Sequence, residues 1–516
     1  MGGPGFAPPG ASTPGAPTEL ERIRGMVATF FPVYETQITP QSVVFHVHAD
    51  PVTLDERFDR LRQQMKPVSY VPILRREVGE YLIEVLRRPP RGPSRTWVNW
   101  GLLIATAFTT SAAGAIIWAS YRGANSVTGA DFAQGALYFA VPLMTILGVH
   151  ELAHFLVARR HHVEASLPYF IPVPPPFLIF GTFGAFISLR EPIPDKRALL
   201  DIGVSGPLAG FAIAIPVALG GLALSAHFPV LNPAACGVSV LGFNVSSLAV
   251  GSSLIWAGLS LLIPVGLFSL HPLALAGWVG ILVTAINLLP AGQLDGGHVF
   301  RALLGDRARY VSYGATAVLF VLGFFYTGWF LFAFLILILG VRHPPPLNDI
   351  TPLDSRRIAA GLVGAAVLLT GFVVVPLVIP TGAFLVTSHG STPAPMAGFG
   401  MGENLSLSVS NHDVAGQAFV LSGTVTSVVG GGNASMFLQN STWVVLLPTG
   451  ARTTFAGNGS FAMSDNNYTL IGPGEAARMT VTYLNLQAAT VTIVLTVSEL
   501  CAGSSGGPRS VPYTVG

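Results

Sequence analysis

His150-Glu151-Leu152-Ala153-His154 reads H-E-x-x-H and directly continues an apolar run from Phe132 to Val149. On an α-helix, residues four positions apart share a face, so both imidazoles can point at one metal ion. Glu151 lies about a third of a turn from His150, which places its carboxylate beside a water on the ion and not on the ion itself. Ionisable side chains at membrane depth are costly and mark functional sites. The motif therefore predicts a metal-dependent hydrolase that works within a lipid bilayer.

The composition of the whole chain agrees with a membrane location. The 516 residues are 51% hydrophobic and only 10% charged, and the mean hydropathy is +0.60. These values predict an α-helical polytopic membrane protein. The net charge is only +2, so no nucleic-acid partner is implied. Two cysteines, Cys236 and Cys501, cannot form a Cys-rich zinc site, so a metal must use histidine and carboxylate ligands.

Basic loops set the expected orientation of the spans. Four arginines between residues 87 and 95 precede a first span at about 97–121, which predicts a cytoplasmic N-terminal region. The second span, about 132–158, ends at Arg159 and Arg160 and so returns to the same side. Further spans are expected near 201–226, 271–290, 310–325, 329–341 and 358–379. About seven crossings result, and they place the C-terminal region outside. Residues 248–268 are apolar enough to cross, but the arginines that follow residue 300 favour a re-entrant or outer-leaflet segment.

The chain divides into five expected parts. The Pro/Gly-rich residues 1–17 predict a disordered tail. Residues 18–90 predict a small cytoplasmic α+β domain with a docking or regulatory role, built from a strand, a helix and two further strands (Val43–Val47, Thr53–Met65, Tyr70–Leu74 and Tyr81–Leu86). Residues 97–345 form the expected intramembrane core, and 355–380 add one more helix.

The fifth part, 385–516, predicts an all-β extracytoplasmic domain. Its Ser, Thr and Val residues alternate as in half-buried strands. Five N-x-S/T patterns past the last span agree with an outside location, at Asn404, Asn433, Asn440, Asn458 and Asn467. Inside the core, residues 165–190 are apolar but interrupted by prolines and glycines, so we expect a re-entrant loop or short hairpin near the metal.

A third metal ligand is expected in the second chemical cluster, NLLPAGQLDGGH (287–298). Catalytic zinc takes three protein ligands plus water. Asp295 follows an apolar span that Pro290 interrupts, and it is the best candidate once the cluster is paired with the histidine motif. Alone, its L-D-G-G sequence reads more readily as a simple helix-ending turn. His298 and His271 are weaker candidates, because His298 can hydrogen-bond the turn and His271 precedes its span on the other side.

HELAH (150–154) followed by NLLPAGQLDGGH resembles the site-2 protease family of intramembrane zinc metalloproteases. Further segments, among them KRALLDIGVSGPLAGF (196–211) and RHPPPLND (342–349), look like those of its archaeal, cyanobacterial and chloroplast branch. The resemblance covers about residues 20–350 and includes no insertion large enough for a PDZ domain. It implies Zn²⁺ held by His150, His154 and Asp295, with Glu151 as general base. It also implies that Asn287 is a polar residue near the scissile peptide.

The resemblance implies hydrolysis of peptide bonds within transmembrane segments of other membrane proteins. Gly181–Gly184 can offer an edge strand to an unwound substrate, or can simply serve close packing; the two readings have equal weight. The competing function is a non-proteolytic metal-dependent transporter or receptor with the same fold. A third hypothesis is a surface-adhesion protein in which residues 385–516 carry the main function, but this hypothesis does not explain the membrane core. The sequence does not specify the oligomeric state or whether the two cysteines pair.

Overall fold

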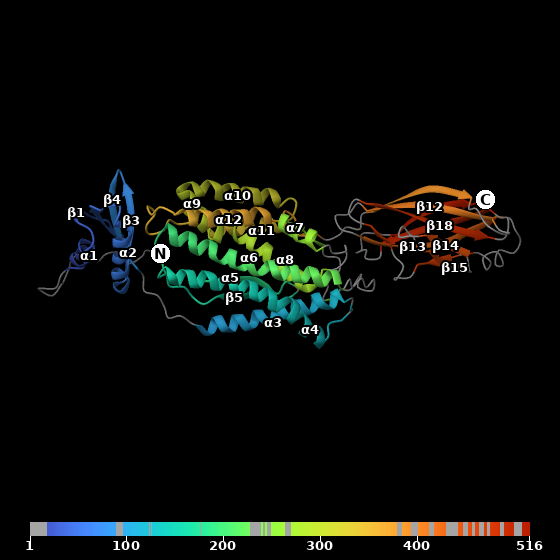
Figure 1. Cartoon of the computed structure of the whole chain (residues 1–516), viewed down its shortest axis with the longest axis horizontal. Helices are drawn as coiled ribbons and strands as arrows, with labels where there is room; N and C mark the ends of the chain where they lie inside the picture. Colours follow the sequence, from blue (N-terminus) through green and yellow to red (C-terminus); the bar gives the residue numbers. More distant parts are fainter. Residues whose placement is uncertain are drawn as a thin grey trace.

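The structure is a computed structural model of the whole chain (Figure 1). It describes residues 18–88, 96–122, 124, 126–175, 177–227, 239–240, 243–244, 249–263 and 270–378, and, in the C-terminal part, 384–393, 401–411, 417–429, 442–446, 452–456, 460–463, 469–471, 475–485, 490–499 and 508–515. The expected tail at 1–17, both cysteines and all the N-x-S/T asparagines except Asn404 lie outside these ranges.

The N-terminal part is an antiparallel four-stranded sheet with two helices. Its order is β1-β2-β4-β3, and its elements are α1 (Glu19–Ala28), β1 (Val33–Ile38), β2 (Ser42–Val47), α2 (Leu54–Met65), β3 (Tyr70–Glu77) and β4 (Glu80–Arg87). One core joins the helices to the sheet and includes Phe31, Phe45, Phe58, Leu61 and Ile83. The predicted strand-helix-strand-strand order is present, while α1 and β1 are additional elements.

The turn between β3 and β4 is shorter than the sequence suggested. The predicted strands ended at Leu74 and resumed at Tyr81, whereas β3 continues to Glu77 and β4 begins at Glu80, so only two residues form the turn. Both turn residues have positive φ, with 50° at Val78 and 90° at Gly79. This is the conformation of a tight hairpin turn, which is favourable for glycine and costly for valine.

The central part is a bundle of apolar helices (Figure 1). Three helices among the described residues are long and apolar enough to cross a membrane, Thr96–Tyr121, Gly129–Arg160 and Lys196–Ala226. The second comprises α4 (Gly129–Gly135), a π-helical turn (Ala136–Ala140) and α5 (Val141–Arg160). The bundle is α3 (Thr96–Tyr121), α4, α5, α6 (Lys196–His227), α8 (Pro272–Asn287), α9 (Asp295–Leu304), α10 (Ala308–Leu322), α11 (Gly328–Leu339) and α12 (Ser355–Gly371).

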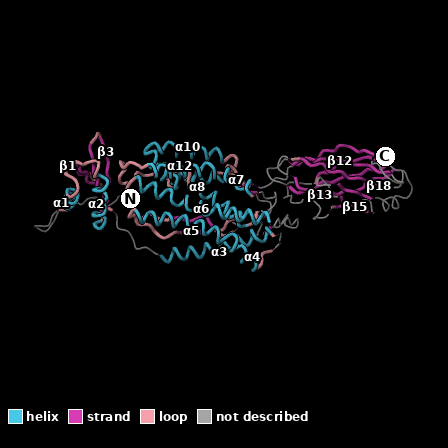
Figure 2. Tube along the Cα trace, viewed as in Figure 1, coloured by secondary structure: helices cyan, strands magenta, loops and turns pink. Residues whose placement is uncertain are grey.

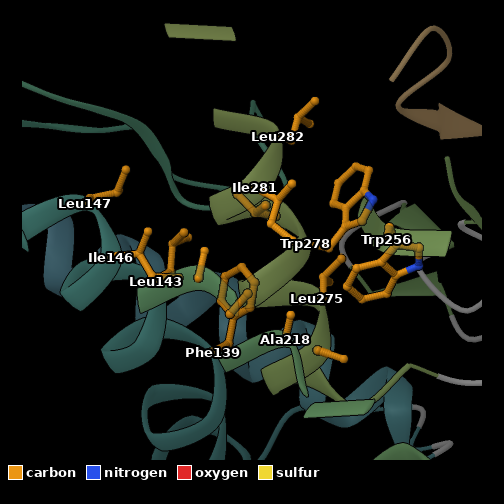
Figure 3. Close-up of a cluster of buried hydrophobic side chains, with 14 of the residues drawn as sticks. Phe139, Leu143, Ile146, Leu147, Ala218, Trp256, Leu275, Trp278, Ile281 and Leu282 are labelled. Carbon is orange, nitrogen blue, oxygen red and sulfur yellow. The ribbon is translucent and has the colours of Figure 1, made fainter. Parts of the chain in front are cut away.

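The bundle core lies where α5, α6 and α8 meet. Figure 3 shows Phe139, Leu143 and Ile146 packed toward Trp278 and Ile281 of α8, beside Ala218 of α6. All of these side chains are at most 5% exposed. Small residues on α6 and α8 allow close approach, since a Cβ at Gly221 of α6 or at Gly277 of α8 would overlap the backbone of the facing helix. The metal motif on α5 is therefore held against two neighbouring helices.

Two predicted irregular segments also have defined structure. Within 165–190, β5 (Tyr169–Pro172) and β6 (Thr182–Phe186) form an antiparallel hairpin, in agreement with the prediction that no continuous helix forms there.

Within 248–268, α7 spans only Leu254–Leu262. Nine residues rise about 14 Å, which is too short to cross a bilayer. Two short antiparallel pairs complete this region: β7 (Ser239–Val240) with β8 (Phe243–Asn244), and β9 (Ala249–Val250) with β10 (Leu377–Val378).

The C-terminal part is all-β, as expected (Figure 2). One sheet has the order β11-β12-β18-β14-β15, and the other has β16-β13-β19-β20 with β17 paired to β13. Their strands are β11 (Phe384–Pro393), β12 (Met401–Asn411), β13 (Gln417–Val429), β14 (Thr442–Leu446), β15 (Arg452–Ala456), β16 (Ser460–Ala462), β17 (Thr469–Ile471), β18 (Ala476–Asn485), β19 (Thr490–Glu499) and β20 (Arg509–Val515). A single core, which includes Trp443 and Tyr483, uses only residues from 384 onward.

The N-terminal part docks on the bundle through the segment that follows α11. The amide of Leu74, in the middle of β3, donates to the Leu347 carbonyl at 2.8 Å. Asn348 is 2% exposed, and its side-chain amide donates to Asp55 of α2 at 2.9 Å. Arg88 and Lys66 pair with Glu191 at 3.3 and 3.0 Å. These contacts tie the small domain to the end of the bundle at which α5 ends and α9 begins.

Candidate metal centre

The two histidines of H-E-x-x-H lie on the inward face of α5. His150 is 3% exposed and His154 is 4% exposed. Their Nε2 atoms are 3.2 Å apart. Such close nitrogens cannot both carry a proton, so at least one presents a lone pair toward the other. The helical spacing alone brings both rings to one point, as the sequence predicted.

Asp295 joins the two histidines from the other side of the bundle. Its Oδ2 atom lies 3.1 Å from His150 Nε2 and 3.2 Å from His154 Nε2. The suggestion that L-D-G-G by itself ends a helix is wrong, because Asp295 is the first residue of α9. Gly292 makes the preceding turn with a φ of 49°. The carbonyl of Leu288 packs against Gly296, which leaves no room for a side chain there.

The three groups suit a metal ion such as zinc. They form the one cluster among the described residues in which three potential ligand atoms all lie within 4.8 Å of one another. Two imidazole nitrogens and one carboxylate oxygen are a donor set used by catalytic zinc, which leaves a further position open. His154 Nδ1 donates to the Ile202 carbonyl of α6 at 2.7 Å. In the neutral ring this bond leaves Nε2 free to bind a metal, and it orients the ring, as the outer hydrogen bond of a metal-bound histidine does.

The remaining predicted site residues lie beside this cluster. Glu151 is 5% exposed, and its carboxylate lies beside the backbone of Ile187, which directly follows β6. Asn287 is the last residue of α8, and its Nδ2 atom lies 3.4 Å from His150 Nε2. The structure therefore brings together all five residues that the sequence singled out: His150, Glu151, His154, Asn287 and Asp295.

The two weaker candidates lie elsewhere. His298 donates from Nδ1 to the Leu294 carbonyl at 3.1 Å, and its ring centroid lies 4.3 Å from that of His343. His271 caps α8 by accepting from the amide of Leu273, at the opposite end of the helix from Asn287. Neither side chain belongs to the three-ligand cluster.

Glycines of α6 are site residues whose role the sequence analysis did not identify. A Cβ at Gly206 would overlap the imidazole of His154, and one at Gly210 would come within 3.2 Å of His150 Nδ1. A Cβ at Gly203 would lie 2.6 Å from His298 Cβ and 3.1 Å from the Asp295 carbonyl. The G-x-x-x-G spacing of 206 and 210 is a known sign of close helix packing in membranes. Here it lets α6 lie directly behind the metal ligands.

Comparison with known proteins supports this arrangement. Residues 138–328 match the model of Peptidase family M50. Over 256 residues the chain is 34% identical to "Probable zinc metalloprotease EGY1, chloroplastic" of Arabidopsis thaliana, a match that covers 48% of this chain and 44% of the relative. It is also 32% identical over 249 residues to "Probable zinc metalloprotease EGY2, chloroplastic" of Oryza sativa subsp. indica. That match covers 47% of this chain and 43% of the relative.

A third similar protein is "Probable zinc metalloprotease EGY3, chloroplastic" of the same rice, 32% identical over 291 residues, with 52% of this chain and 47% of the relative covered. The chain thus spans about half the length of the curated relatives that it matches. The M50 match contains both clusters of the metal centre. Residues 138–328 of this chain therefore match a peptidase M50 (site-2 protease) domain, and this part of the chain is similar to the chloroplast zinc metalloproteases.

Proposed function

We propose that this chain is an intramembrane zinc endopeptidase that hydrolyses peptide bonds within transmembrane segments of other proteins. The observation that carries the proposal is the meeting of His150 and His154 of α5 with Asp295 of α9, within 3.2 Å of one another. When bound there, zinc would polarise the scissile carbonyl and lower the pKa of a coordinated water. The three side chains are the proposed ligands.

Glu151 is the proposed general base. It is adjacent to His150 in the chain but is not part of the three-ligand cluster, so its carboxylate remains available to accept a proton from the attacking water. The same group then delivers that proton to the nitrogen of the leaving amine. The carboxylate lies beside the backbone of Ile187 and is buried and shielded from bulk solvent. Asn287 is proposed to donate a hydrogen bond from Nδ2 to the substrate carbonyl, since its amide already lies beside His150.

The β6 strand is the proposed substrate platform. Among the described residues β6 pairs only with β5, so its other edge has no strand partner. Phe183 and Phe186 are 48% and 50% exposed, and the strand leads into Ile187 at the general base. Gly181 serves packing, because a Cβ there would overlap the backbone of α3 at Thr109. The close-packing reading therefore fits Gly181, and the edge-strand reading is proposed for residues 182–186.

We further propose the topology that the basic loops predict. The N-terminal and C-terminal parts lie at opposite ends of the bundle (Figure 1), which supports an odd number of crossings. Seven would be α3, α4–α5, α6, α8, α10, α11 and α12. The N-terminal domain (18–90) and the metal centre would then face the cytoplasmic side of the cell membrane, and 385–516 the outside. The core would span 97–345, with 355–380 as the added helix.

The test compares wild-type chain with Glu151→Gln in cells. Membrane proteins are surveyed by mass spectrometry for new peptide ends that fall within transmembrane segments. The proposal expects such ends with the wild type and none with the variant, while zinc content stays the same. Glu164→Gln, a nearby exposed carboxylate outside the site, is the matched control and should cleave normally. Equal cleavage by Glu151→Gln would exclude the assigned base, and a non-proteolytic transporter would give no new ends with either protein.

A further inference from the structure

A polar pocket, separate from the metal centre, lies at the end of the bundle that faces the N-terminal domain. Its volume is about 190 Å³, and it is formed by α9, the start of α10 and the segment that follows α11. Arg301, Asp306, Arg309, Ser312, Arg342 and His343 contribute to its walls. The proposed proteolytic mechanism uses none of these residues.

The pocket carries excess positive charge. Among the described residues, no carboxylate pairs with Arg309 or Arg342. Instead Arg309 donates to the Tyr310 hydroxyl at 2.9 Å, and Arg342 donates to the Tyr313 hydroxyl at 3.0 Å. Asp306 is the one acidic residue in the wall. Two guanidinium groups are therefore available to an anionic ligand.

Arg301 is held at the base of the pocket. It is 5% exposed, and its Nη2 atom pairs with Asp349 at 2.7 Å and Asp306 at 3.1 Å. Its Nη1 atom is buried and has no hydrogen-bond partner within the described part of the chain. An unsatisfied buried donor on a charged group is costly. A ligand oxygen that reaches Nη1 would remove that cost.

The start of α10 adds to the positive character. This 15-residue helix begins at Ala308, which lines the pocket; the amide of Ala308 already donates to the carbonyls of Gly305 and Asp306, so the helix start contributes its dipole and not a free amide at Ala308. The N-terminus of a helix carries partial positive charge and favours anions. This dipole adds to the positive potential of the buried Arg301 donor and of the two arginines that have no carboxylate partner among the described residues.

We propose that this pocket binds a phosphate group, and that its source is the headgroup of an anionic phospholipid. Guanidinium groups suit phosphate oxygens because they donate two parallel hydrogen bonds. Tyr310 and Tyr313 are 63% and 46% exposed beside the pocket, as in the aromatic belt at a membrane surface. The outer faces of α10 and α11 expose apolar side chains that acyl chains can cover, among them Val318, Val321, Leu337 and Ile338.

Occupancy of the pocket would restrain the metal centre. Gly297 and Arg301 belong to the pocket and to α9, and α9 begins with Asp295. The ring of His343 in the pocket wall packs on His298 of the same helix. A bound phosphate group would therefore fix the helix that carries the third proposed ligand.

The test measures binding of three probes to the full chain in an uncharged detergent by titration calorimetry. The probes are short-chain phosphatidylglycerol, short-chain phosphatidylcholine and inorganic phosphate. Wild type should bind phosphatidylglycerol best, and Arg309→Gln/Arg342→Gln should weaken that binding by about tenfold or more. The matched control, Arg307→Gln/Arg356→Gln, removes two exposed arginines from the same end of the bundle but not from the pocket. It should stay within about twofold of wild type.

Each outcome decides the matter. Tight binding of inorganic phosphate that competes with phosphatidylglycerol would support the phosphate site but assign it to a soluble ligand. The proposal would be overturned if neither phosphatidylglycerol nor inorganic phosphate binds. An equal loss of phosphatidylglycerol affinity in the control variant would also overturn it. Zinc content and the unfolding temperature check that the variants remain folded. If the glutamine pair does not fold, Arg309→Lys/Arg342→Lys keeps the charge and should show a smaller loss, whereas unchanged affinity would count against guanidinium recognition. Since none of these readouts involves proteolysis, they remain valid if the proposed peptidase activity fails.

Discussion

Gly206 of α6 lies against the imidazole of His154 so closely that a methyl group at position 206 would overlap the ring. The same helix accepts the Nδ1 hydrogen bond of His154 through the Ile202 carbonyl. Ring position therefore depends on two features of α6, one steric and one polar. Metal-ligand geometry in this fold is set as much by the helix behind the ligands as by the helix that carries them.

Gly206→Ala should consequently impair the metal centre. The added methyl must push either His154 or α6 away, and we expect zinc affinity to fall by about tenfold to a hundredfold. Metal titration of the apo-protein with zinc provides the measurement. Gly314→Ala on α10 is the control, since a Cβ there has no neighbour within 4 Å. Equal zinc affinity in both variants would show that α6 does not position the ligand.

Asn348 should hold the N-terminal domain to the bundle. It donates to Asp55 at 2.9 Å and lies between Leu74 and Asp195, with which it forms parallel bridges. Asn348→Ala removes one hydrogen bond to Asp55, which keeps the bond from Thr351, and should cost about 0.5–1.5 kcal/mol of docking free energy. Hydrogen exchange of the Leu74 amide, which bonds to Leu347, should become faster. Gln63→Ala, on the exposed face of α2, should leave that exchange rate unchanged.

Val78 should be a site at which the N-terminal domain can be stabilised. It is fully exposed and has a φ of 50°, a left-handed conformation that a β-branched residue adopts at a cost of about 1–2 kcal/mol. Asparagine followed by glycine is preferred in such a two-residue hairpin turn. We expect Val78→Asn to raise the opening free energy of β3–β4 by about 1 kcal/mol, measured by native-state hydrogen exchange at Ile83. A decrease would mean that the turn has another conformation.

The ion pairs of Lys66 should make docking depend on pH. Burial lowers the pKa of Lys66, but hydrogen bonds to Glu191 and Glu164 outweigh this and raise it above its ordinary value of 10.5. The hydrogen bond from Lys66 lowers the pKa of Glu164 below 4.5. The raised lysine contributes stability below pH 10.5 that is lost as the pH rises further. The lowered carboxyl contributes stability above pH 4.5 that is lost as the pH falls through its folded pKa.

Lys66→Met tests this dependence. Because Glu164 is 58% exposed, its pair with Lys66 should contribute only about 0.2–1 kcal/mol. The difference in unfolding temperature between wild type and variant should be constant from about pH 6 to 9 and should shrink below pH 4.5. A difference that grows on acidification would contradict the assigned pairing.

The sequence predicted the site better than it predicted the elements around it. The H-E-x-x-H spacing predicts the relative position of its two histidines, because helical periodicity alone brings His150 and His154 together. Asp295 could be proposed because a carboxylate at membrane depth needs a partner. The position of α6 was not predictable in the same way, because G-x-x-x-G indicates close approach without saying which helix approaches.

Local signals explain the elements that the sequence analysis missed. Thr18 and Glu21 form a capping box at the start of α1. This pattern is present in the sequence, but it directly follows the Pro/Gly-rich tail and was not recognised as a helix start. β1 has an irregular register, with a shift between Val33 and Glu35, so strict alternation fails there. The predicted strand ended three residues too early, because Arg75, Arg76 and Glu77 are polar although all three remain in β3.

The central claim is that two separate helices hold one zinc ion through His150, His154 and Asp295. Elemental analysis of purified full-length chain, compared with Asp295→Ala, tests it most directly. The account predicts about one zinc per wild-type chain and a large loss of zinc from the variant, with the unfolding behaviour of the β-rich C-terminal part unchanged. Wild-type protein without zinc after zinc-replete purification, or a variant that retains the full amount, would contradict it.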